Sequence, residues 1–460
     1  MNVTLLSPDL ESILAAHVVR QRWYGAKHRA GVDLRIETVE EIEPPWPGLL
    51  RVSVEASSPE SVERYQLVLG LRPEQEANPS TVGEAATVGI LETPEGPAFC
   101  FDGLVDPELG MMLLHHVAPA QKATSVRPVG AEQSNSSLVY DERLILKLFR
   151  RLTGANPEIE VTLALAQQGF THVAEPVAVW RTGGDDLAVL QRFLPGGAEG
   201  WALAQTSVRD ALDEGVDPAE AGGDLAPEAE RLGLMTAELH IAMAEAFGVG
   251  PGDPQGWADA TAVRVASVHH PDLDADAIAA VLDRVRGLTD AGSSIRIHGD
   301  YHLGQVMRTD EGWYVLDFEG EPARPVEERR QPSSPLRDVA GMLRSFDYAA
   351  AIGVREQAAR GPSTGELDLS ALRQAEARAP APTPEELAAV WQRRNRDAFL
   401  DAYGDRLSGS PLLPADPRSI ERLLAFFELD KALYEVAYEQ AHRPDWVQIP
   451  LAAVGRLVEP

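Results

Sequence analysis

The feature that most constrains the fold of this chain is a pair of short apolar runs, each of which ends in a carboxylate. The first run begins at Ile295 and leads through His-Gly to Asp300, and an amide side chain, Gln305, follows five residues later. The second run begins at Tyr314 and ends at Asp317. Runs of this kind predict strands that end in loops. Two carboxylates and an amide on such loops match what phosphoryl transfer from ATP requires.

Size and composition restrict what else the chain can be. With 460 residues it exceeds the length that one hydrophobic core serves, so we expect two or three subdomains. The formal charge of −30 argues against nucleic acid and anionic membranes as partners, because both attract basic proteins. A single cysteine, Cys100, excludes an intrachain disulfide and a thiolate zinc site. The sequence shows no basic-then-apolar leader and no apolar run of bilayer length, so we expect a cytoplasmic protein.

The first hundred residues predict a separate small unit. A helix is expected from Asp9 to Val19, because apolar residues recur there at helical spacing. Strands are expected at 34–39, 49–54 and 63–71, and residues 97–118 repeat the strand pattern less clearly. The prediction is a helix packed on a small antiparallel sheet.

Candidates for binding ATP follow in the next hundred residues. A stretch rich in hydroxyl and amide groups lies between two strand-like runs at 125–129 and 138–140, and a hairpin tip of this kind can fold over phosphates. The alternative is an ordinary turn, because the stretch lacks the glycines of a phosphate-binding loop. Its candidate nucleotide-binding residues are Gln133, Ser134, Asn135 and Ser136.

A lysine inside an apolar run is a second nucleotide-binding candidate. Lys147 interrupts the strand predicted at 143–151, so it must reach solvent, pair with a carboxylate or meet a phosphate. Glu160 lies in the first turn of a helix expected to begin near Pro157, and we predict that it pairs with Lys147. The segment from Gln191 to Leu194, which includes Phe193, lies at the end of the next strand pair and is the predicted hinge that offers backbone groups to adenine.

The remaining chain predicts a mostly helical unit. Helices are expected from about Glu199 to Thr289, from Leu336, and from Pro384 to Tyr403, with a loose connection at 351–385. Asp338 is interpreted as a structural residue that bonds to the backbone of the loop at Asp300.

The last long helix, expected at 419–442, carries an unusual polar face. One side of it is apolar, and the opposite side alternates charged and aromatic residues, which suits a sugar better than bulk solvent does. Arg443, just after the helix, is expected to close the same pocket. A plain solvent-exposed face is the alternative. The candidate sugar-binding residues on this face are Lys431, Tyr434, Glu435 and Tyr438.

Roles for the central stretch follow from phosphoryl-transfer chemistry. Asp300 is the predicted catalytic base, which orients the acceptor hydroxyl and takes its proton. Gln305 and Asp317 offer oxygen ligands of the kind Mg²⁺ prefers. His302 is expected to lie next to the substrate and to bond a carboxylate. A helical zinc site of His298 and His302 is an alternative that the intervening glycine disfavours.

These motifs resemble a known family. His298-Gly-Asp-x-His-x-x-Gln and Leu316-Asp-Phe-Glu-Gly-Glu are similar to the aminoglycoside-phosphotransferase-like branch of the kinase fold. A wider match, covering nearly the whole chain, resembles the actinobacterial maltokinases. It includes Arg20-Gln-Arg-Trp-Tyr, Ile145-Leu-Lys-Leu-Phe-Arg-Arg, Glu428-Leu-Asp-Lys-Ala-Leu-Tyr-Glu and Arg443-Pro-Asp-Trp.

The resemblance implies an α+β, bilobal, protein-kinase-like fold with an extra N-terminal α+β cap and a mostly helical C-terminal lobe. The expected boundaries are a cap at 1–100, an intermediate subdomain at 101–194 that completes the ATP-binding lobe, and a helical lobe at 195–460. It further implies that ATP, with Mg²⁺, phosphorylates maltose at the anomeric hydroxyl and that the maltose 1-phosphate feeds α-glucan synthesis. An association with an enzyme that interconverts trehalose and maltose is also expected.

Three other functions remain open at this point. The chain could phosphorylate another sugar, such as glucosamine. It could be a non-catalytic partner of a maltose- or trehalose-converting enzyme, although that reading requires the loss of an essential group, and Lys147, Asp300, Gln305 and Asp317 are all present. An aminoglycoside kinase is the third alternative, which the mixture of lysine and tyrosine on the last helix does not favour.

Overall fold

The computed structural model describes residues 9–25, 32–44, 47–58, 61–76, 82–93, 95–130, 134–321, 326–360 and 382–459. The chain divides into two compact units. The first comprises Met1–Leu163 and Ala174–Pro195, and the second comprises Ala164–Val173 and Gly196–Pro460. The first is built mainly on antiparallel sheets and the second mainly on helices, so the expected α+β class is confirmed.

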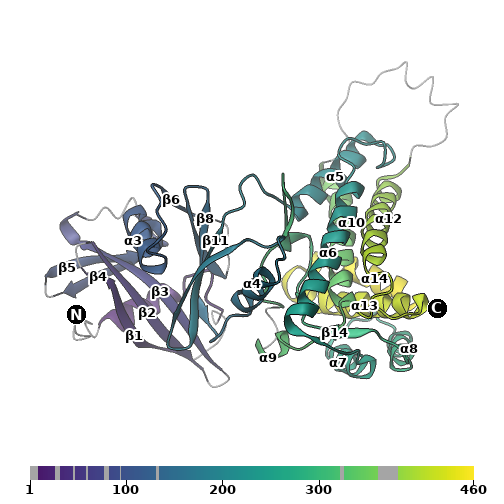
Figure 1. Cartoon of the computed structure of the whole chain (residues 1–460), viewed down its shortest axis with the longest axis horizontal. Coiled ribbons are helices and arrows are strands. Elements are labelled where there is room, and N and C mark those ends of the chain that lie inside the picture. The colour runs from purple at the N-terminus through teal and green to yellow at the C-terminus, as the bar shows by residue number, and fades with distance from the viewer. Residues whose placement is uncertain are drawn as a thin grey trace, which may run out of the picture. The chain divides into compact units, whose positions relative to one another are not determined.

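The first unit begins with a helix on a strongly paired sheet (Figure 1). Helix α1 (Asp9–Val18) packs on strand β4, and buried His17 places Nδ1 3.2 Å from the carbonyl of Thr87. The sheet has the order β1-β2-β3-β5-β4, and β9 pairs with β3 off this path. Its strands are β1 (Asp33–Glu43), β2 (Gly48–Ser57), β3 (Val62–Pro73), β4 (Thr87–Thr93), β5 (Gly96–Asp102) and β9 (Arg151–Leu152). The expected helix and strands are confirmed, with longer strands than predicted.

A second, five-stranded antiparallel sheet completes the first unit, in the order β10-β11-β8-β7-β6. Its strands are β6 (Val126–Pro128), β7 (Asn135–Tyr140), β8 (Leu144–Phe149), β10 (Pro176–Thr182) and β11 (Asp185–Arg192). The two sheets share buried contacts. The amide of Gln66 on β3 is fully buried and donates to the carbonyls of Phe149 at 2.6 Å and Leu187 at 2.7 Å. The predicted boundary near residue 100 stays a prediction.

Two helices of the first unit depart from the sequence pattern. Residues 97–118 were expected to repeat the strands, but α3 (Pro107–Val117) is a helix, because Asp106 caps it and Pro107 occupies its first position. That part of the prediction is wrong. Helix α4 (Pro157–Gln167) begins where expected and crosses the boundary between the two units.

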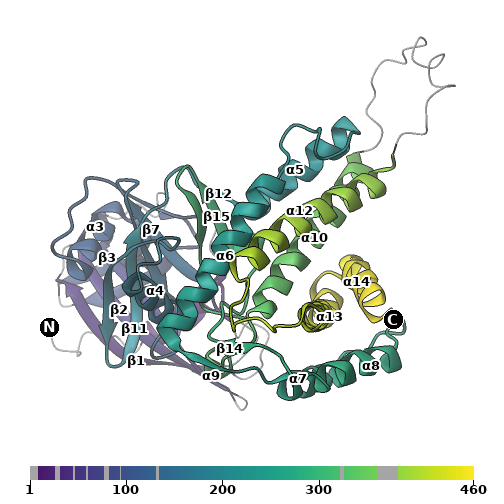
Figure 2. The ribbon, with the colours of Figure 1, turned by 45° about the vertical axis from the view of Figure 1, so that its right-hand side comes forward.

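The second unit is a group of long helices in which α5, α6, α10 and α12 lie side by side (Figures 1 and 2). Helix α13 packs on both α10 and α14. The helices are α5 (Gly200–Glu214), α6 (Ala226–Phe247), α7 (Pro254–Ser267), α8 (Ala275–Arg286), α9 (Val326–Arg329), α10 (Leu336–Arg360), α12 (Pro384–Arg406), α13 (Pro417–His442) and α14 (Gln448–Val458). Because α10 continues to Arg360, the connection expected at 351–385 is wrong for its first ten residues.

Short strands and turns hold the central stretch inside this helical unit. One small sheet has the order β12-β15-β16, and β13 pairs with β14. These strands are β12 (Ala198–Glu199), β13 (Val249–Pro251), β14 (Ser293–Ile295), β15 (Val306–Thr309) and β16 (Gly312–Val315). The part of the chain that the structure describes has one-turn 3-10 helices at η2 (Glu74–Glu76), η3 (Gly103–Val105), η4 (Leu303–Gln305) and η6 (Pro444–Trp446).

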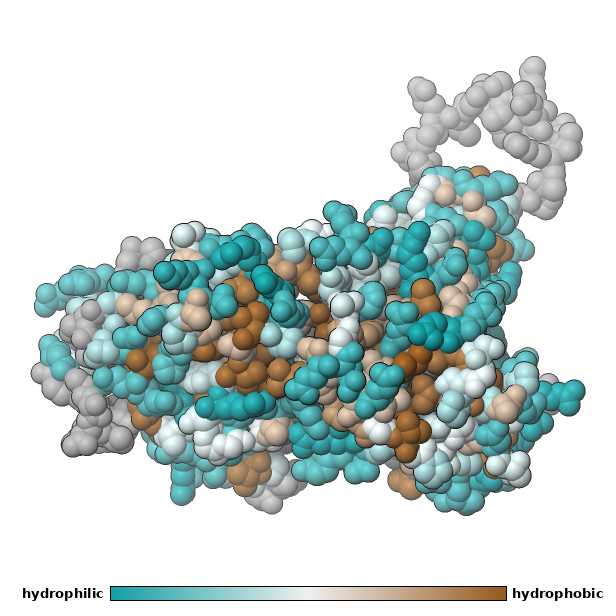
Figure 3. Space-filling model, viewed as in Figure 1, coloured by the Kyte–Doolittle hydropathy of each residue, from teal (hydrophilic) through white to brown (hydrophobic). Residues whose placement is uncertain are grey.

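The surface drawn in Figure 3 is mostly polar. The face drawn in Figure 3 is covered largely by hydrophilic residues, with smaller hydrophobic groups between them. Across the described ranges, no helix combines the length and the apolar character that crossing a membrane requires.

Candidate active site

The loop that carries Asp300 is fixed from beneath by a buried carboxylate. Asp338, near the start of α10, is almost completely buried. Its Oδ2 accepts a hydrogen bond from the backbone of His298 at 2.7 Å, and its Oδ1 accepts one from Gly299 at 2.9 Å. Gly299 has a φ of +85°, which a residue with a side chain rarely adopts. The interpretation of Asp338 as a structural residue is confirmed.

A buried histidine on α6 contacts the carboxylate of Asp338. His240 on α6 is fully buried, with Nε2 3.3 Å from Asp338 and Nδ1 2.9 Å from the hydroxyl of Tyr403. Burial alone would raise the pKa of Asp338, but His240, His298 and the amide of Gly299 lower it below its usual range. Asp338 therefore remains a carboxylate that accepts hydrogen bonds from the loop.

Both nitrogens of the His298 ring form hydrogen bonds with the backbone around the same loop. Its Nε2 lies 2.9 Å from the carbonyl of Leu316, and its Nδ1 accepts from the backbone of Asp300 at 3.3 Å. The ring packs on Phe318, with centroids 5.0 Å apart. Because both ring nitrogens have backbone partners, a zinc site of His298 and His302 is not supported.

Asp300 forms an ion pair with a lysine of α13, the last long helix. Nζ of Lys431 lies 3.3 Å from Oδ1 of Asp300, and Nε2 of His302 lies 4.0 Å from Oδ2. The side chain of Asp300 is 20% exposed, so it can still reach a ligand. Burial lowers the pKa of His302 from its usual 6.5, and its Nδ1 accepts from the backbone of Gly304 at 3.0 Å. His302 is thus a neutral group beside the carboxylate at neutral pH.

Gln305 and Asp317 are brought together as the sequence predicted. Nε2 of Gln305, at the end of η4, donates to Oδ2 of Asp317 at 3.4 Å. Asp317 has a φ of +63°, a strained conformation for a residue with a side chain and one that clusters at functional sites. The carboxylate and the amide supply oxygen atoms that suit a hard divalent cation, provided that the amide turns its oxygen toward the ion.

The predicted sugar face on α13 is present, and its aromatic residues are stacked. Ring centroids are 6.3 Å apart between Tyr434 and Tyr438, and 4.4 Å apart between Tyr438 and His442. Tyr438 is 41% exposed. Arg443 is 5.6 Å from the ring of Tyr438 and forms an ion pair of 2.7 Å with Glu439. The role of these residues in binding a sugar stays a prediction.

Glu435 does not lie on that face as predicted. It is buried, and its Oε2 accepts from Arg344 of α10 at 2.7 and 3.0 Å. Position 435 is one residue, about 100°, around the helix from Tyr434, which turns it toward α10. Burial raises the pKa of Glu435, and Arg344 opposes this. The correction assigns Glu435 to the contact between α13 and α10 rather than to the exposed face.

In the first unit, Lys147 forms an ion pair with a glutamate that the sequence analysis did not single out. Nζ of Lys147 lies 2.5 Å from Oε2 of Glu158, and Glu158 is buried. The expected pairing of Lys147 with Glu160 stays a prediction. Both glutamates lie in the first turn of α4, so spacing along the sequence could not separate them.

Three of the four nucleotide-binding candidates predicted at the hairpin tip lie in the described part of the chain. Ser134, Asn135 and Ser136 lie where the β6–β7 hairpin enters β7, as expected, while Gln133 lies outside the described residues. The hydroxyl of Ser136 accepts from Arg150 at 2.8 Å.

The hinge prediction needs a correction at Phe193. Its backbone N–H donates to the carbonyl of Arg143 at 2.9 Å, and is therefore not available to adenine. Gln191 is paired within the sheet, opposite Ile145 of β8 and Pro176 of β10.

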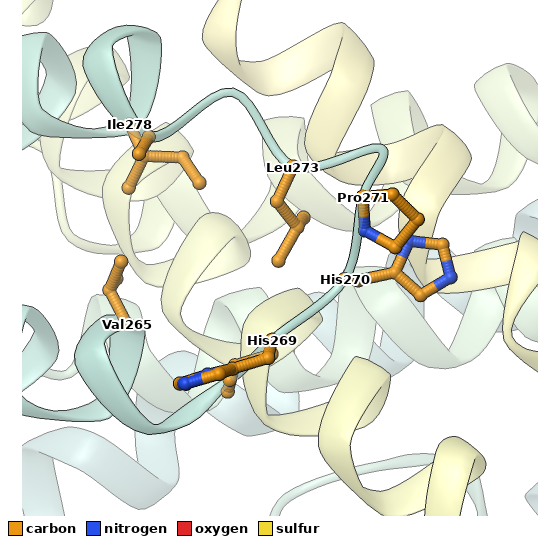
Figure 4. A pocket seen from close by; sticks show the side chains of 8 residues that line it. Val265, His269, His270, Pro271, Leu273 and Ile278 are labelled. Atoms are coloured by element: carbon orange, nitrogen blue, oxygen red, sulfur yellow. The ribbon is translucent and has the colours of Figure 1, made fainter.

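A larger hollow in the helical unit lies away from this chemistry. The loop between α7 and α8 lines it with apolar side chains and two histidines, and its volume is about 430 Å³ (Figure 4). Among the described residues that line it, none carries a carboxylate. It therefore lacks the groups that a phosphoryl-transfer site needs.

Comparison with protein-family models identifies the fold. Residues 125–373 match the phosphotransferase enzyme family, and residues 17–106 match the maltokinase N-terminal cap domain. The chain belongs to the phosphotransferase enzyme family. It is a maltokinase-like protein with a kinase fold, and a kinase of the sugar type.

Two curated relatives of this phosphotransferase are glucosamine kinases. The protein from Mycolicibacterium smegmatis (strain ATCC 700084 / mc(2)155) is 27% identical over 364 residues, which are 74% of this chain and 81% of the relative. The protein from Streptacidiphilus jiangxiensis is 30% identical over 352 residues, which are 72% of this chain and 73% of the relative.

Solved structures of glucosamine kinase share the fold. One, in complex with glucosamine, ADP and inorganic phosphate, is 22% identical, with a TM-score of 0.63 over 99% of this chain and 100% of that one. A second crystal form gives a TM-score of 0.65 at 22% identity, over 98% of this chain and 100% of that one.

Proposed function

We propose that this sugar kinase transfers the γ-phosphoryl group of ATP to the anomeric hydroxyl of maltose, giving maltose 1-phosphate and ADP. The observation that carries the proposal is the 3.3 Å contact between Lys431 and Asp300. The contact supports the proposal because it joins α13, whose face carries polar and aromatic residues, to the carboxylate that we assign to orienting the acceptor. The match of residues 17–106 to the maltokinase cap model supports the same choice.

In this proposal each described residue of the site has its own role in phosphoryl transfer. Asp300 orients the acceptor hydroxyl and takes its proton as the new bond to phosphorus forms. Lys147, held by Glu158, neutralises charge on the nucleotide phosphates. Gln305 and Asp317 are the proposed Mg²⁺ ligands. When bound, the ion would neutralise charge on the phosphates.

The length of the α13 face favours a disaccharide over a single sugar. Lys431 and Tyr438 are seven residues apart, so they are separated by roughly 10 Å along the helix. A first sugar ring held at Asp300 leaves Tyr434 and Tyr438 beside a second ring. Aromatic faces with polar neighbours suit that arrangement, because a sugar ring has apolar C–H faces and polar edges.

An ADP-release assay over maltose, glucosamine, glucose and trehalose tests the choice of acceptor. We expect maltose to give the highest kcat/KM, and phosphorus NMR of the product should show phosphate on the anomeric carbon. Turnover that does not depend on maltose would overturn the proposal.

Glucosamine is the second candidate, because the two curated relatives described above are named glucosamine kinases. The charges near Asp300 favour a neutral sugar instead. Lys431 lies beside Asp300, and Asp430 is already paired with Arg264 and Arg337, so neither carboxylate is reserved for an ammonium group. A higher kcat/KM with glucosamine than with maltose in the same assay would decide for the relative's activity.

The cellular role follows from the chemistry of the product. A sugar 1-phosphate is an activated glycosyl donor, and we propose that it feeds α-glucan synthesis in the cytoplasm. Association with an enzyme that interconverts trehalose and maltose remains part of this proposal, and co-purification of the two proteins tests it.

A further inference from the structure

A network of charged side chains joins four helices of the helical unit around α13. Its members lie on α10, α12, α13 and α14 and form ion pairs with one another. Four of the six side chains are buried. This charge network consists of Arg344, Asp347, Arg396, Glu428, Glu435 and Arg456. Three members are cationic and three are anionic, so their charges balance. The roles proposed above for phosphoryl transfer include none of them.

Arg344 of α10 connects two carboxylates of the charge network. Its side chain is 1% exposed. Its Nε and Nη2 donate to Oε2 of Glu435 at 3.0 and 2.7 Å, and its Nη1 donates to Oδ2 of Asp347 at 2.6 Å. A guanidinium is planar and rigid, so three donors used at once fix the directions of both carboxylates. The carboxylate of Glu435 is therefore held against α10 in one orientation.

A second arginine attaches α13 to α12 on the other side of Lys431. Nη1 of Arg396 on α12 lies 3.2 Å from Oδ1 of Asp347 and 2.9 Å from Oε2 of Glu428. Glu428 is three residues before Lys431, and Glu435 is four residues after it. These spacings correspond to about one turn of the helix in each direction. The charge network therefore fixes α13 to its neighbours one turn before and one turn after Lys431.

The contact between Lys431 and Asp300 depends on how α13 is held. Nζ of Lys431 lies 3.3 Å from Oδ1 of Asp300, just beyond the usual range for an N–H···O bond, so a small shift of the helix would break the contact. A lysine side chain is also long and flexible, and holding it in one geometry costs conformational entropy. Glu435 has the opposite charge and is one turn away on the helix, so it attracts the ammonium group.

We propose that Arg344 and Glu435 are positioning residues for phosphoryl transfer. The ion pair between them fixes the turn of α13 that carries Lys431, and so holds the ammonium group of Lys431 at Asp300. The inference rests on the proposed function, in which Asp300 is the catalytic base. Arg344 acts through Lys431 and does not touch the sugar. Loss of the pair lets Lys431 move away, and Asp300 then loses the cation beside it.

A double-mutant cycle with Lys431 tests the positioning role. The acceptor is the sugar with the highest kcat/KM in the ADP-release assay, so the test does not depend on the choice of maltose. Arg344→Met should lower kcat/KM for that sugar by about 10-fold or more, while the KM for ATP stays within about 2-fold. In a Lys431→Met background the same substitution should cost less than about 3-fold, because the group that it positions is already absent.

Three further variants separate positioning from damage to the fold. Arg394→Met is the matched control, because Arg394 also makes two hydrogen bonds to a carboxylate, that of Asp224, at 3.0 and 2.6 Å, and lies outside the charge network. It should stay within about 2-fold of the wild type. Arg344→Lys keeps the charge without the rigid fork and should recover part of the lost kcat/KM. Where thermal unfolding shows that Arg344→Met does not fold, Glu435→Gln keeps the size of its side chain and takes its place in the cycle, with the same pattern expected.

Two results would overturn the positioning role and leave the kinase proposal intact. One is an unchanged kcat/KM in Arg344→Met. The other is a pair of losses that multiply in the double variant, because a residue that only stabilises the fold acts independently of Lys431. A wild type that turns over no sugar would instead overturn the proposed function.

Discussion

Lys431 of α13 places Nζ 3.3 Å from Oδ1 of Asp300, although the two residues are 131 positions apart in the chain. Burial alone would lower the pKa of Lys431, but the charges of Asp300, Glu321 and Glu435 raise it above its usual value. Lys431 therefore stays charged at neutral pH. The contact links the residue that we assign to proton transfer with the helix that we assign to the sugar.

Removal of the ammonium group should weaken use of the sugar. Lys431→Met is expected to lower kcat/KM for maltose by about 10- to 100-fold, because a hydrogen bond between charged groups contributes roughly 1.5–3 kcal/mol. The KM for ATP should change little. Lys122→Met is the matched control, since Lys122 is exposed in the first unit. An equal loss in the control, or a loss confined to ATP, would contradict the assignment.

The two glutamates of α4 should behave differently. Glu158→Gln removes the charge of a partner of Lys147 and should lower kcat/KM for ATP by about 10-fold or more, because a part-buried ion pair that positions the lysine is lost. Glu160→Gln should stay within about 3-fold of the wild type. Titration of each variant with ATP at saturating maltose measures both effects. A larger loss in Glu160→Gln than in Glu158→Gln would contradict this assignment and favour Glu160 as the partner predicted from the sequence.

Asp338 should matter for stability as well as activity. Asp338→Asn places an amide NH₂ against one of the two backbone N–H groups that the carboxylate accepts. We expect a loss of roughly 3 kcal/mol and a lower kcat, because a buried hydrogen-bonded charge is lost. Thermal unfolding followed by circular dichroism measures the stability. Asp445→Asn is the control, because Asp445 is exposed, and it should leave the stability and kcat unchanged. Equal losses in the two variants would contradict the role that we assign to Asp338.

His302 should make stability depend on pH in a predictable direction. Burial depresses its pKa below 6.5, so the unfolded chain binds this proton more readily than the folded one. Its contribution is present above about pH 6.5 and is lost as the pH falls through the lower folded value. His302→Asn keeps a side chain that can cap η4 but does not titrate. The difference in melting temperature between wild type and variant should therefore shrink from pH 7.5 to 5. A constant difference would contradict the assignment.

Much of the fold was predictable from apolar periodicity. The strands of both antiparallel sheets and the start of α13 follow patterns that local residues impose. The helix α3 was missed because its first residue, Pro107, and its cap, Asp106, were read as part of a strand-like repeat. The end of α10 was missed because alanine, glutamate and glycine in the segment after residue 351 suit both a helix and a loop.

The residues of the candidate site were also predictable from the sequence only in part. Asp300, Gln305 and Asp317 could be named as candidates from the sequence because local motifs carry them. Glu158 was missed because two glutamates of one helical turn differ only in direction. The pairing of Glu435 with Arg344 joins two helices far apart in the chain, and no local pattern specifies such a contact.

The most direct test of the account is the turnover of Asp300→Asn with maltose and ATP, measured together with ATP binding by calorimetry. The account predicts that kcat falls by about 10²- to 10⁴-fold while the affinity for ATP stays within about 2-fold, because only proton transfer and acceptor orientation are lost. A variant that retains more than about a tenth of the wild-type kcat would contradict the assignment of Asp300 as the base.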